Sequence, residues 1–376
     1  MAVRQVPEKN WTKDGRKWMF ELRIKDSTGK QHHYRSRMFF TRKEALKAEH
    51  DYIEDIDKSN IKDSMTFGDL ANEHFEYQKD KVKYTTQSNY KKKMLHFDSL
   101  FKIRICDLSI NDIEKWKVEI NKKLTPAGTP LATRTKNDLF KYLKSILNYG
   151  TKWHDFNFAS MYNKMVNFNN PNELPKEMEF YTYEEFKKFI AVEEDIKYKA
   201  LFKTLYYCGL RRGELRGLSW DNLDFDRKEL SVKKNVVNVS GDSGYWLLTT
   251  PKTKSSNRVI SMPDTLISDL KLLKEEENKK YGFEEKWFVF GDIAPIHPDV
   301  LRRRKNENAE KAGVKQIRIH DFRHSCASLL INNGANITMV AKYLGHTKVD
   351  ETLNTYSHMF KNKLDNIVDT INKLDS

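Results

Sequence analysis

The most informative stretch of the chain is residues 208–218, which read Cys-Gly-Leu-Arg-Arg-Gly-Glu-Leu-Arg-Gly-Leu. Three more stretches follow in order: Pro-Lys-Thr-Lys-Ser-Ser-Asn-Arg at 251–258, His-Asp-Phe-Arg at 320–323 and Leu-Gly-His at 344–346. Ten positions beyond the last histidine comes Tyr356, inside Thr-Leu-Asn-Thr-Tyr-Ser-His. Each stretch alone is compatible with an ordinary helix or surface, so the information lies in their joint order and spacing.

Taken as chemistry, these residue types fit phosphoryl transfer without a metal ion. The guanidiniums of Arg211 and Arg323 can brace the non-bridging oxygens of a phosphodiester under attack, because each is a bidentate, permanently charged fork. The Tyr356 hydroxyl can be the nucleophile and form a covalent phosphotyrosine, with His320 as its base. Lys252 can protonate the departing 5′-oxygen. No Asp/Glu cluster with magnesium-ligand spacing accompanies the set, so we expect no metal site.

Together, these four stretches and Tyr356 resemble the motifs of the tyrosine recombinase (phage integrase) family. Gly-Leu-Arg-x-x-Glu-Leu is similar to the family's first box, and the 251–258 segment resembles its β-hairpin lysine segment. His-Asp-Phe-Arg-His-Ser and Leu-Gly-His with its distant tyrosine are similar to the second arginine box and the nucleophile box. The resemblance implies six catalytic residues: Arg211, Lys252, His320, Arg323, His346 and Tyr356.

The resemblance also implies a role for each of them. The two arginines stabilise the transition state, the first histidine assists proton transfer and the second contacts the phosphate. Tyr356 attacks DNA to give a 3′-phosphotyrosine, and Lys252 is the general acid, with Lys254 as an open alternative. Glu214, one helical turn beyond the first arginine, orients the site.

Family membership implies partners as well. Because the phosphotyrosine stores the energy of the broken bond, no cofactor is expected. The expected partners are double-stranded DNA with core and arm sites, three further protomers in a DNA-bound homo-tetramer, an excisionase and a DNA-bending host factor. Residues 359–374 carry an apolar stripe at helical spacing, and the resemblance favours docking of this tail on a neighbouring protomer over docking in cis.

Composition agrees with a nucleic-acid partner. The 376 residues include 67 Lys and Arg against 53 Asp and Glu, a net charge of +14 with a pI near 9.3, and such a surplus attracts polyanions. Three widely spaced cysteines argue against a disulfide scaffold. The sequence contains no apolar run of about 18 residues and no signal peptide. We therefore expect a cytoplasmic protein with no membrane contact.

Residues 1–60 predict a small sheet with one helix, and the resemblance identifies them as a three-stranded arm-type DNA-binding domain. In residues 17–25 apolar and polar side chains alternate, which is typical of a half-buried strand, and residues 31–37 return as a second strand. Thr41 and Glu44 form a capping box that opens a helix to about Ile56. Residues 1–40 hold ten Lys and Arg against four Asp and Glu, a net +6. The expected DNA contacts are Arg23, Lys25, Arg35 and Arg37.

The rest of the chain predicts two more domains, so the fold class is a multi-domain, mainly α protein with small β sheets. Residues 64–165 follow helical spacing and resemble the family's helical, SAM-like core-binding domain. Residues 169–175 are a polar, proline-bearing linker. Residues 176–376 alternate helices with a β section near 228–262, in keeping with a mixed α+β catalytic domain that ends in a tail helix.

Two other functions remain open from the sequence. A type IB topoisomerase also uses a tyrosine nucleophile with arginine, lysine and histidine, but the Leu-Gly-His box and the arm-binding segment favour a recombinase. A DNA-binding regulator without catalytic activity explains the charge but not the six-residue set. The leading interpretation is an integrase that integrates and excises a mobile element or prophage.

Overall fold

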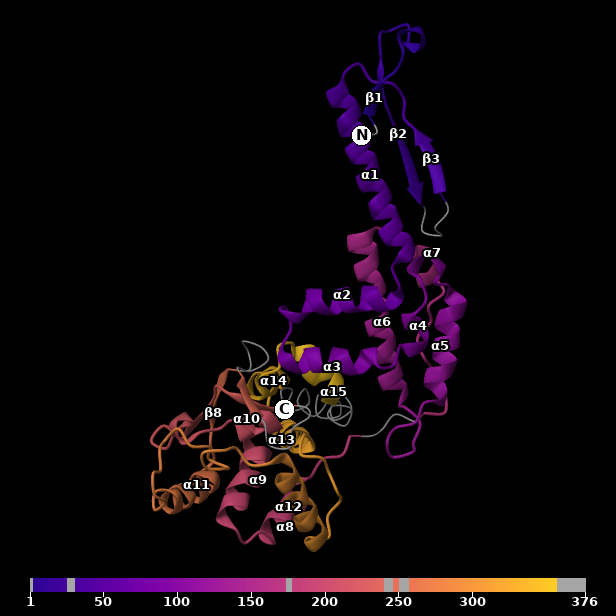
Figure 1. Ribbon diagram of the computed structural model, residues 1–376. Coiled ribbons are helices and arrows are strands. Elements are labelled where there is room, and N and C mark those ends of the chain that lie inside the picture. Colours follow the sequence, from indigo (N-terminus) through magenta and orange to yellow (C-terminus); the bar gives the residue numbers. More distant parts are fainter. Residues whose placement is uncertain (1–2, 26–30, 174–177, 240–245, 250–256, 357–376) are drawn as a thin grey trace, which may run out of the picture. The chain divides into compact units, whose positions relative to one another are not determined.

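The computed structural model describes residues 3–25, 31–173, 178–239, 246–249 and 257–356 (Figure 1). The chain divides into two compact units, residues 1–174 and 175–376. In the described part, helices predominate and the strands form small antiparallel sheets. The predicted fold class is therefore confirmed.

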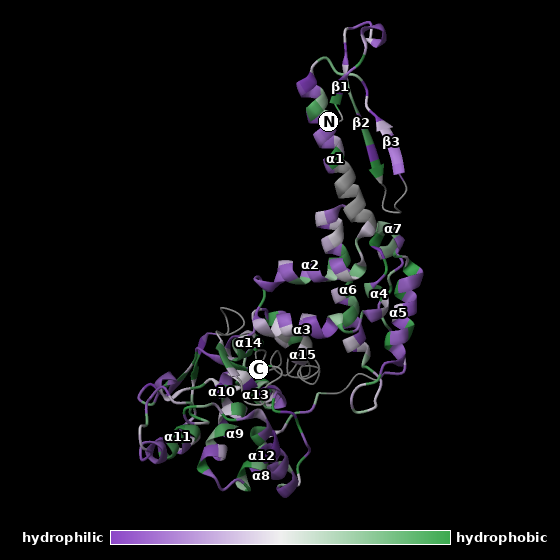
Figure 2. Ribbon diagram, in the orientation of Figure 1, coloured by the Kyte–Doolittle hydropathy of each residue, from purple (hydrophilic) through white to green (hydrophobic). Residues whose placement is uncertain are grey.

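The first unit begins with a three-stranded antiparallel sheet in the order β1 (Val3–Gln5), β2 (Trp18–Lys25), β3 (Gln31–Arg35). A short 3-10 turn, η1 (Glu8–Asn10), precedes β2. The alternation in β2 places Phe20 in a buried cluster, with Trp18 and Leu22 partly buried beside it. Helix α1 (Arg42–Ser64) covers this face of the sheet, whereas β3 is hydrophilic along its length (Figures 1 and 2).

Local capping chemistry starts α1 as predicted, but the predicted end is wrong. The Glu44 amide donates to Thr41 Oγ1 at 3.2 Å, and the Thr41 amide donates to the Glu44 carboxylate at 3.5 Å. The helix then continues past Ile56 to Ser64. The prediction relied on the apolar stripe of an amphipathic helix. Residues 57–64 are mostly polar, so the sequence pattern did not indicate that α1 continues through them.

The remainder of the first unit is helical. Its buried cluster includes Trp116, Phe140 and Leu143, and Ser109 with Asp112 forms a capping box at the start of α5 (Ile110–Lys122). The elements are α2 (Phe67–Lys79), α3 (Tyr84–Met94), α4 (Asp98–Phe101), η2 (Ile105–Asp107), α5 (Ile110–Lys122), α6 (Thr133–His154) and α7 (Ala159–Tyr162).

The second unit is built around α9 (Ile196–Cys208), which packs against α8, α11 and α13. Residues from Ala200 to Cys208 are almost all buried, as expected of a helix surrounded by others. Thr182 and Glu185 form a capping box at the start of α8 (Tyr183–Ala191). The other helices are α8 (Tyr183–Ala191), α10 (Arg212–Arg216), η3 (Trp220–Asn222), α11 (Asp264–Glu277), α12 (Pro298–Lys311), α13 (Asp321–Asn332), α14 (Ile337–Leu344) and α15 (Val349–Tyr356).

The predicted β section of the second unit is confirmed as two small sheets. One has the order β4-β5-β8 and the other pairs β6 with β7. The strands are β4 (Leu223–Asp224), β5 (Glu229–Val232), β6 (Asn235–Asn238), β7 (Trp246–Thr249) and β8 (Arg258–Ser261). Lys252, Lys254 and the tail at 359–374 lie outside the described residues. Among the described helices, none combines the length and apolarity that a membrane crossing requires.

Candidate active site

Five of the six predicted catalytic residues line one pocket of the second unit, although they come from four separate places in the chain. Arg211 immediately precedes α10, His320 and Arg323 lie at the start of α13, and His346 follows α14, while Tyr356 ends α15. His324 and Thr355 complete the lining. The sixth predicted residue, Lys252, lies outside the described residues.

Two glycine carbonyls hold the two arginines. Arg323 Nη1 donates to the Gly209 carbonyl at 2.9 Å, and Arg211 Nη2 donates to the Gly345 carbonyl at 3.3 Å. Each glycine ends a helix in the left-handed region, with φ of 59° and 71° respectively. A Cβ on Gly209 would lie 2.6 Å from a methyl group of Leu344. The tight turn and close packing at this position therefore explain the glycine.

A buried carboxylate ties the first arginine to a second one. Glu214, with a side chain 2% exposed, accepts from Arg211 Nη1 at 2.7 Å and from Arg258 Nη2 at 3.0 Å. Burial opposes its ionisation, but Arg258 and Arg211 hold the pKa of Glu214 below its ordinary value. Sequence reasoning did not single out Arg258, although it ends the 251–258 stretch. Glu214 thus fixes the position of the Arg211 guanidinium.

Arg323 is the most deeply buried cation of the pocket, at 2% exposure. Its Nη2 is buried and has no hydrogen-bond partner among the described residues. Burial, followed by the neighbouring charges of Arg211 and Arg258, lowers the pKa of Arg323 to about 9. Three guanidiniums face one carboxylate, that of Glu214, so the site carries an excess of positive charge. An anion such as a phosphodiester would satisfy both the charge and the unpartnered donor.

The tyrosine is paired with a histidine that the sequence interpretation did not select. Tyr356 is 1% exposed, and its Oη lies 2.6 Å from Nδ1 of His324. Burial raises the pKa of the Tyr356 hydroxyl above its ordinary value. The only signal in the sequence is the place of His324, one helical turn after His320 and directly after Arg323. Another tyrosine of this unit, Tyr343, donates instead to the Tyr207 carbonyl at 2.9 Å.

His346 lies between α14 and α15 and is held there as a neutral imidazole. Its Nδ1 lies 2.6 Å from Thr352 Oγ1, and its amide donates to the Ala341 carbonyl at 2.9 Å. Burial, followed by the charges of Arg323 and Arg211, lowers the pKa of His346 to about 4. Its second ring nitrogen remains to contact a ligand in the pocket.

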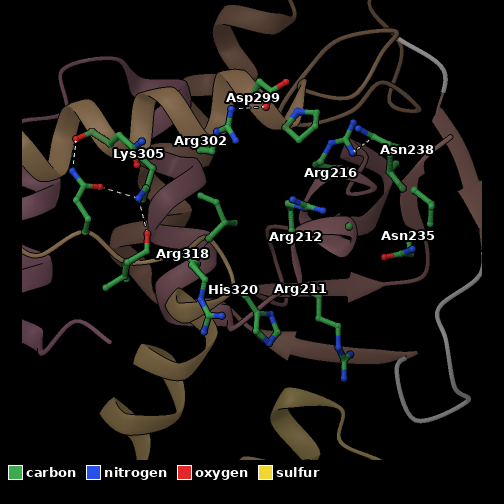
Figure 3. Close-up of a pocket in the computed structure, with 18 residues that line it drawn as sticks. Arg211, Arg212, Arg216, Asn235, Asn238, Asp299, Arg302, Lys305, Arg318 and His320 are labelled. Carbon is green, nitrogen blue, oxygen red and sulfur yellow. Dashed lines mark hydrogen bonds and ion pairs between the residues drawn. The ribbon is translucent and has the colours of Figure 1, made fainter. Parts of the chain in front are cut away.

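A larger basic groove of about 980 Å³ shares Arg211 and His320 with this pocket (Figure 3). Its two buried cations hold backbone carbonyls: Arg216 Nε donates to the Ile296 carbonyl at 2.7 Å, and Lys305 Nζ to the Ile317 carbonyl at 2.6 Å. Its exposed cations lie on α10, on α12 and before α13, and they are Arg212, Arg302 and Arg318. Arg302 and Arg318 pair with Asp299 and Asp321. The groove therefore offers a charged surface that leads into the pocket.

The predicted DNA contacts of the first sheet have different surroundings. Arg23 and Arg35 are exposed on β2 and β3, and Lys25 is the last residue of β2. Glu21 pairs with Arg35 at 2.7 Å and with Arg4 at 2.8 Å on the same sheet. Arg37 follows β3, with its guanidinium 5.5 Å from the centre of the Phe39 ring. Glu21 therefore pairs with two of the arginines on this face, Arg35 and Arg4, of which the sequence prediction named only Arg35.

No group of three or more His, Cys, Asp or Glu side chains that could hold a metal ion occurs within the described ranges.

Comparison with known proteins agrees with this geometry. Residues 176–363 match the model of the phage integrase family, and residues 7–56 match an arm DNA-binding domain. The ICEBs1 integrase of Bacillus subtilis is 31% identical over 53% of this chain, and the match spans 55% of that integrase. A XerC-like tyrosine recombinase of Caldanaerobacter subterraneus is 28% identical over 89% of this chain and 90% of its own length.

Solved structures show the same fold. The Tn1549 transposon integrase in complex with a circular intermediate DNA matches with a TM-score of 0.64, at 20% identity, over 82% of this chain and 100% of that one. A lambda integrase dimer bound to a core site matches with a TM-score of 0.55, at 12% identity, over 77% of this chain and 95% of that one. The chain belongs to the phage integrase family of tyrosine recombinases, enzymes that cleave and rejoin DNA.

Proposed function

We propose that this chain is the integrase of a mobile element or prophage, which joins and separates two DNA sites through a covalent 3′-phosphotyrosine on Tyr356. The observation that carries the proposal is the pocket itself. Arg211 and Arg323 line it together with a tyrosine hydroxyl, and a buried guanidinium nitrogen of Arg323 lacks a partner. A scissile phosphate between the two arginines would complete this arrangement.

The mechanism then follows from the neighbours of the phosphate. The two guanidiniums stabilise the charge that develops on the non-bridging oxygens, and Glu214 holds the first of them in place. His346 donates a hydrogen bond to the phosphate and His320 assists proton transfer. Lys252, or Lys254, protonates the departing 5′-oxygen. The 5′-hydroxyl of a partner strand later attacks the phosphotyrosine and rejoins the DNA.

The proposed division of labour follows the three predicted domains. Residues 176–376 cut the core site and guide its backbone along the groove of Arg212 and Arg302, residues 64–165 clamp the core site, and residues 1–60 bind an arm site. The structural relatives support this reading, since the Tn1549 and lambda integrases were solved in complex with DNA, the latter also as a tetramer on a Holliday junction. We propose a homo-tetramer on DNA in the cytoplasm, directed by an excisionase and a DNA-bending host factor.

Two substrates test the proposal. A core site with a nick beside the cleavage position loses its leaving strand, so the covalent protein–DNA adduct should accumulate. Two intact sites in one reaction should yield recombinant junctions, and a single site should yield none. A protein that binds the site without forming an adduct would be a regulator. Relaxation of supercoiled DNA without recombinant product would instead indicate a topoisomerase.

A further inference from the structure

A hydrogen bond joins the Tyr356 hydroxyl to a residue outside the six-residue set, on a helix 32 positions away in the sequence. His324 lies on α13 and Tyr356 at the end of α15, and the 2.6 Å contact joins His324 Nδ1 to Tyr356 Oη. We propose that His324 is a further catalytic residue, which orients the Tyr356 hydroxyl and accepts its proton as the oxygen attacks DNA. The inference rests on the proposed function, because it takes Tyr356 as the nucleophile.

The geometry favours His324 over His320 for this step. The two rings lie edge to face, with centroids 5.1 Å apart, and the His324 ring is the one within hydrogen-bond distance of the tyrosine oxygen. A general base must lie within about 2.6–3.2 Å of the oxygen whose proton it removes. His320 packs against the His324 ring, so it is placed to orient His324.

The surroundings of His324 keep its imidazole neutral before DNA arrives. Burial, followed by His320, lowers the pKa of His324 to about 4. A neutral imidazole that carries its hydrogen on Nε2 has a free lone pair on Nδ1, which can accept from the tyrosine hydroxyl. The titratable and charged groups near the ring come from α13, the segment before it, the end of α14 and α15: Arg318, His320, Asp321, Arg323, His346 and Tyr356.

Binding of the phosphate makes His324 a better proton acceptor. A negative charge in the pocket favours the imidazolium and offsets the neighbouring arginines. As the Tyr356 Oη–phosphorus bond forms and the bond from phosphorus to the 5′-oxygen breaks, the phenolic proton moves to His324 Nδ1. The 5′-oxygen takes its proton from Lys252 or Lys254. Rejoining runs in reverse, and His324 returns its proton to the departing tyrosine.

Two substitutions separate proton acceptance from packing. His324→Asn keeps an oxygen acceptor near the position of Nδ1 but has no basicity, and His324→Phe keeps the ring without an acceptor. General base catalysis contributes about 10²–10⁴-fold, so single-turnover adduct formation by both variants should fall by at least about 10²-fold. Binding of the core site should persist, which shows that each variant is folded. An asparagine variant within a few-fold of the native rate would overturn the proposal. His50→Asn, an exposed histidine of α1, is the matched control.

A modified substrate locates the defect on the nucleophile. When sulfur replaces the bridging 5′-oxygen, the leaving thiolate needs no proton, so a lost general acid is bypassed. The His324→Asn variant should remain slow on this substrate, and a full rescue would place His324 on the leaving-group side and overturn the inference. Adduct formation by Tyr356→Phe would refute the proposed function instead. Native rates in His324→Asn beside an inactive Tyr356→Phe would refute this inference alone.

Discussion

The catalytic pocket and the first sheet both collect arginines, but they hold them in opposite ways. In the pocket Arg323 is 2% exposed and is held by a backbone carbonyl, and a buried carboxylate fixes its neighbour Arg211. On the sheet the side chains of Arg35 and Arg4 are 64% and 53% exposed, and they share Glu21. The pocket arginines are therefore more deeply buried than those of the sheet, although the Arg211 side chain is still 34% exposed.

The difference in burial predicts that the pocket arginines control the rate of cleavage and that the sheet arginines control the affinity for DNA. A desolvated, pre-oriented cation acts strongly on charge that develops nearby, so it changes a rate. An exposed cation attracts phosphates through counterion release, so it changes affinity and salt dependence. Substitutions in the pocket should slow cleavage with little change in binding, and substitutions on the sheet should do the reverse.

The largest expected effect is the loss of the nucleophile. Tyr356→Phe removes only the oxygen that forms the covalent bond, so adduct and recombinant product should vanish while core-site binding survives. Tyr343→Phe is the matched control, because its hydroxyl donates to the Tyr207 carbonyl. It should retain adduct formation, as measured on nicked substrate by denaturing gels. Adduct in the Tyr356 variant would shift the nucleophile to another residue.

The next effect concerns the two pocket arginines. Arg211→Lys and Arg323→Lys keep the charge but lose the bidentate fork, and loss of one donor to a charged transition state costs about 10²–10³ in rate. Single-turnover cleavage should slow by that factor with core-site affinity nearly unchanged. Arg227→Lys, at an exposed arginine paired with Asp224 outside the pocket and the groove, should cleave normally. Equal effects of all three substitutions on the cleavage rate would contradict the proposed difference between pocket arginines and exposed arginines.

A smaller effect is expected on the sheet. Arg23→Ala and Arg35→Ala should each weaken arm-site binding and reduce the slope of log affinity against log salt by about one, with core-site cleavage unchanged. Glu21→Gln releases Arg4 and Arg35 from their shared partner, so it should tighten binding to any duplex. Gel shifts across a salt series measure both, with Arg227→Ala as an exposed control in the other unit. An unchanged slope in the sheet variants would argue against this DNA-binding face.

The smallest effect concerns stability and pH. His324 and His346 have folded-state pKa values of about 4, below the unfolded value of about 6.5. As the pH falls below about 6.5, the unfolded chain binds protons at these histidines that the folded chain does not bind. The free energy of unfolding is therefore highest above about pH 6.5 and declines towards pH 4. The urea midpoint of the second unit's transition should be lower at about pH 5 than at about pH 7. His346→Gln should reduce that decrease, and a midpoint that rises would contradict it.

Local chemistry explains how much the sequence could predict. Alternation predicted the β2 strand, and Thr41 with Glu44 predicted the start of α1, because these signals need only neighbouring residues. The end of α1 was missed, since a polar helix turn has no distinctive pattern. The predicted catalytic residues came from their order along the chain, and their roles remain predictions. Neither His324 nor Arg258 could be selected, because their contacts join residues 32 and 44 positions apart.

The proposed mechanism requires a covalent bond between Tyr356 and DNA, which peptide mapping can detect. Trypsin digestion of the adduct on nicked substrate, followed by mass spectrometry, identifies the modified peptide. Cleavage after Lys348 and Lys361 releases residues 349–361, in which Tyr356 is the only tyrosine. We expect this peptide to carry the nucleotide remnant on Tyr356, attached through a 3′-phosphate. A remnant on any other peptide, or one attached through a 5′-phosphate, would contradict the proposed mechanism.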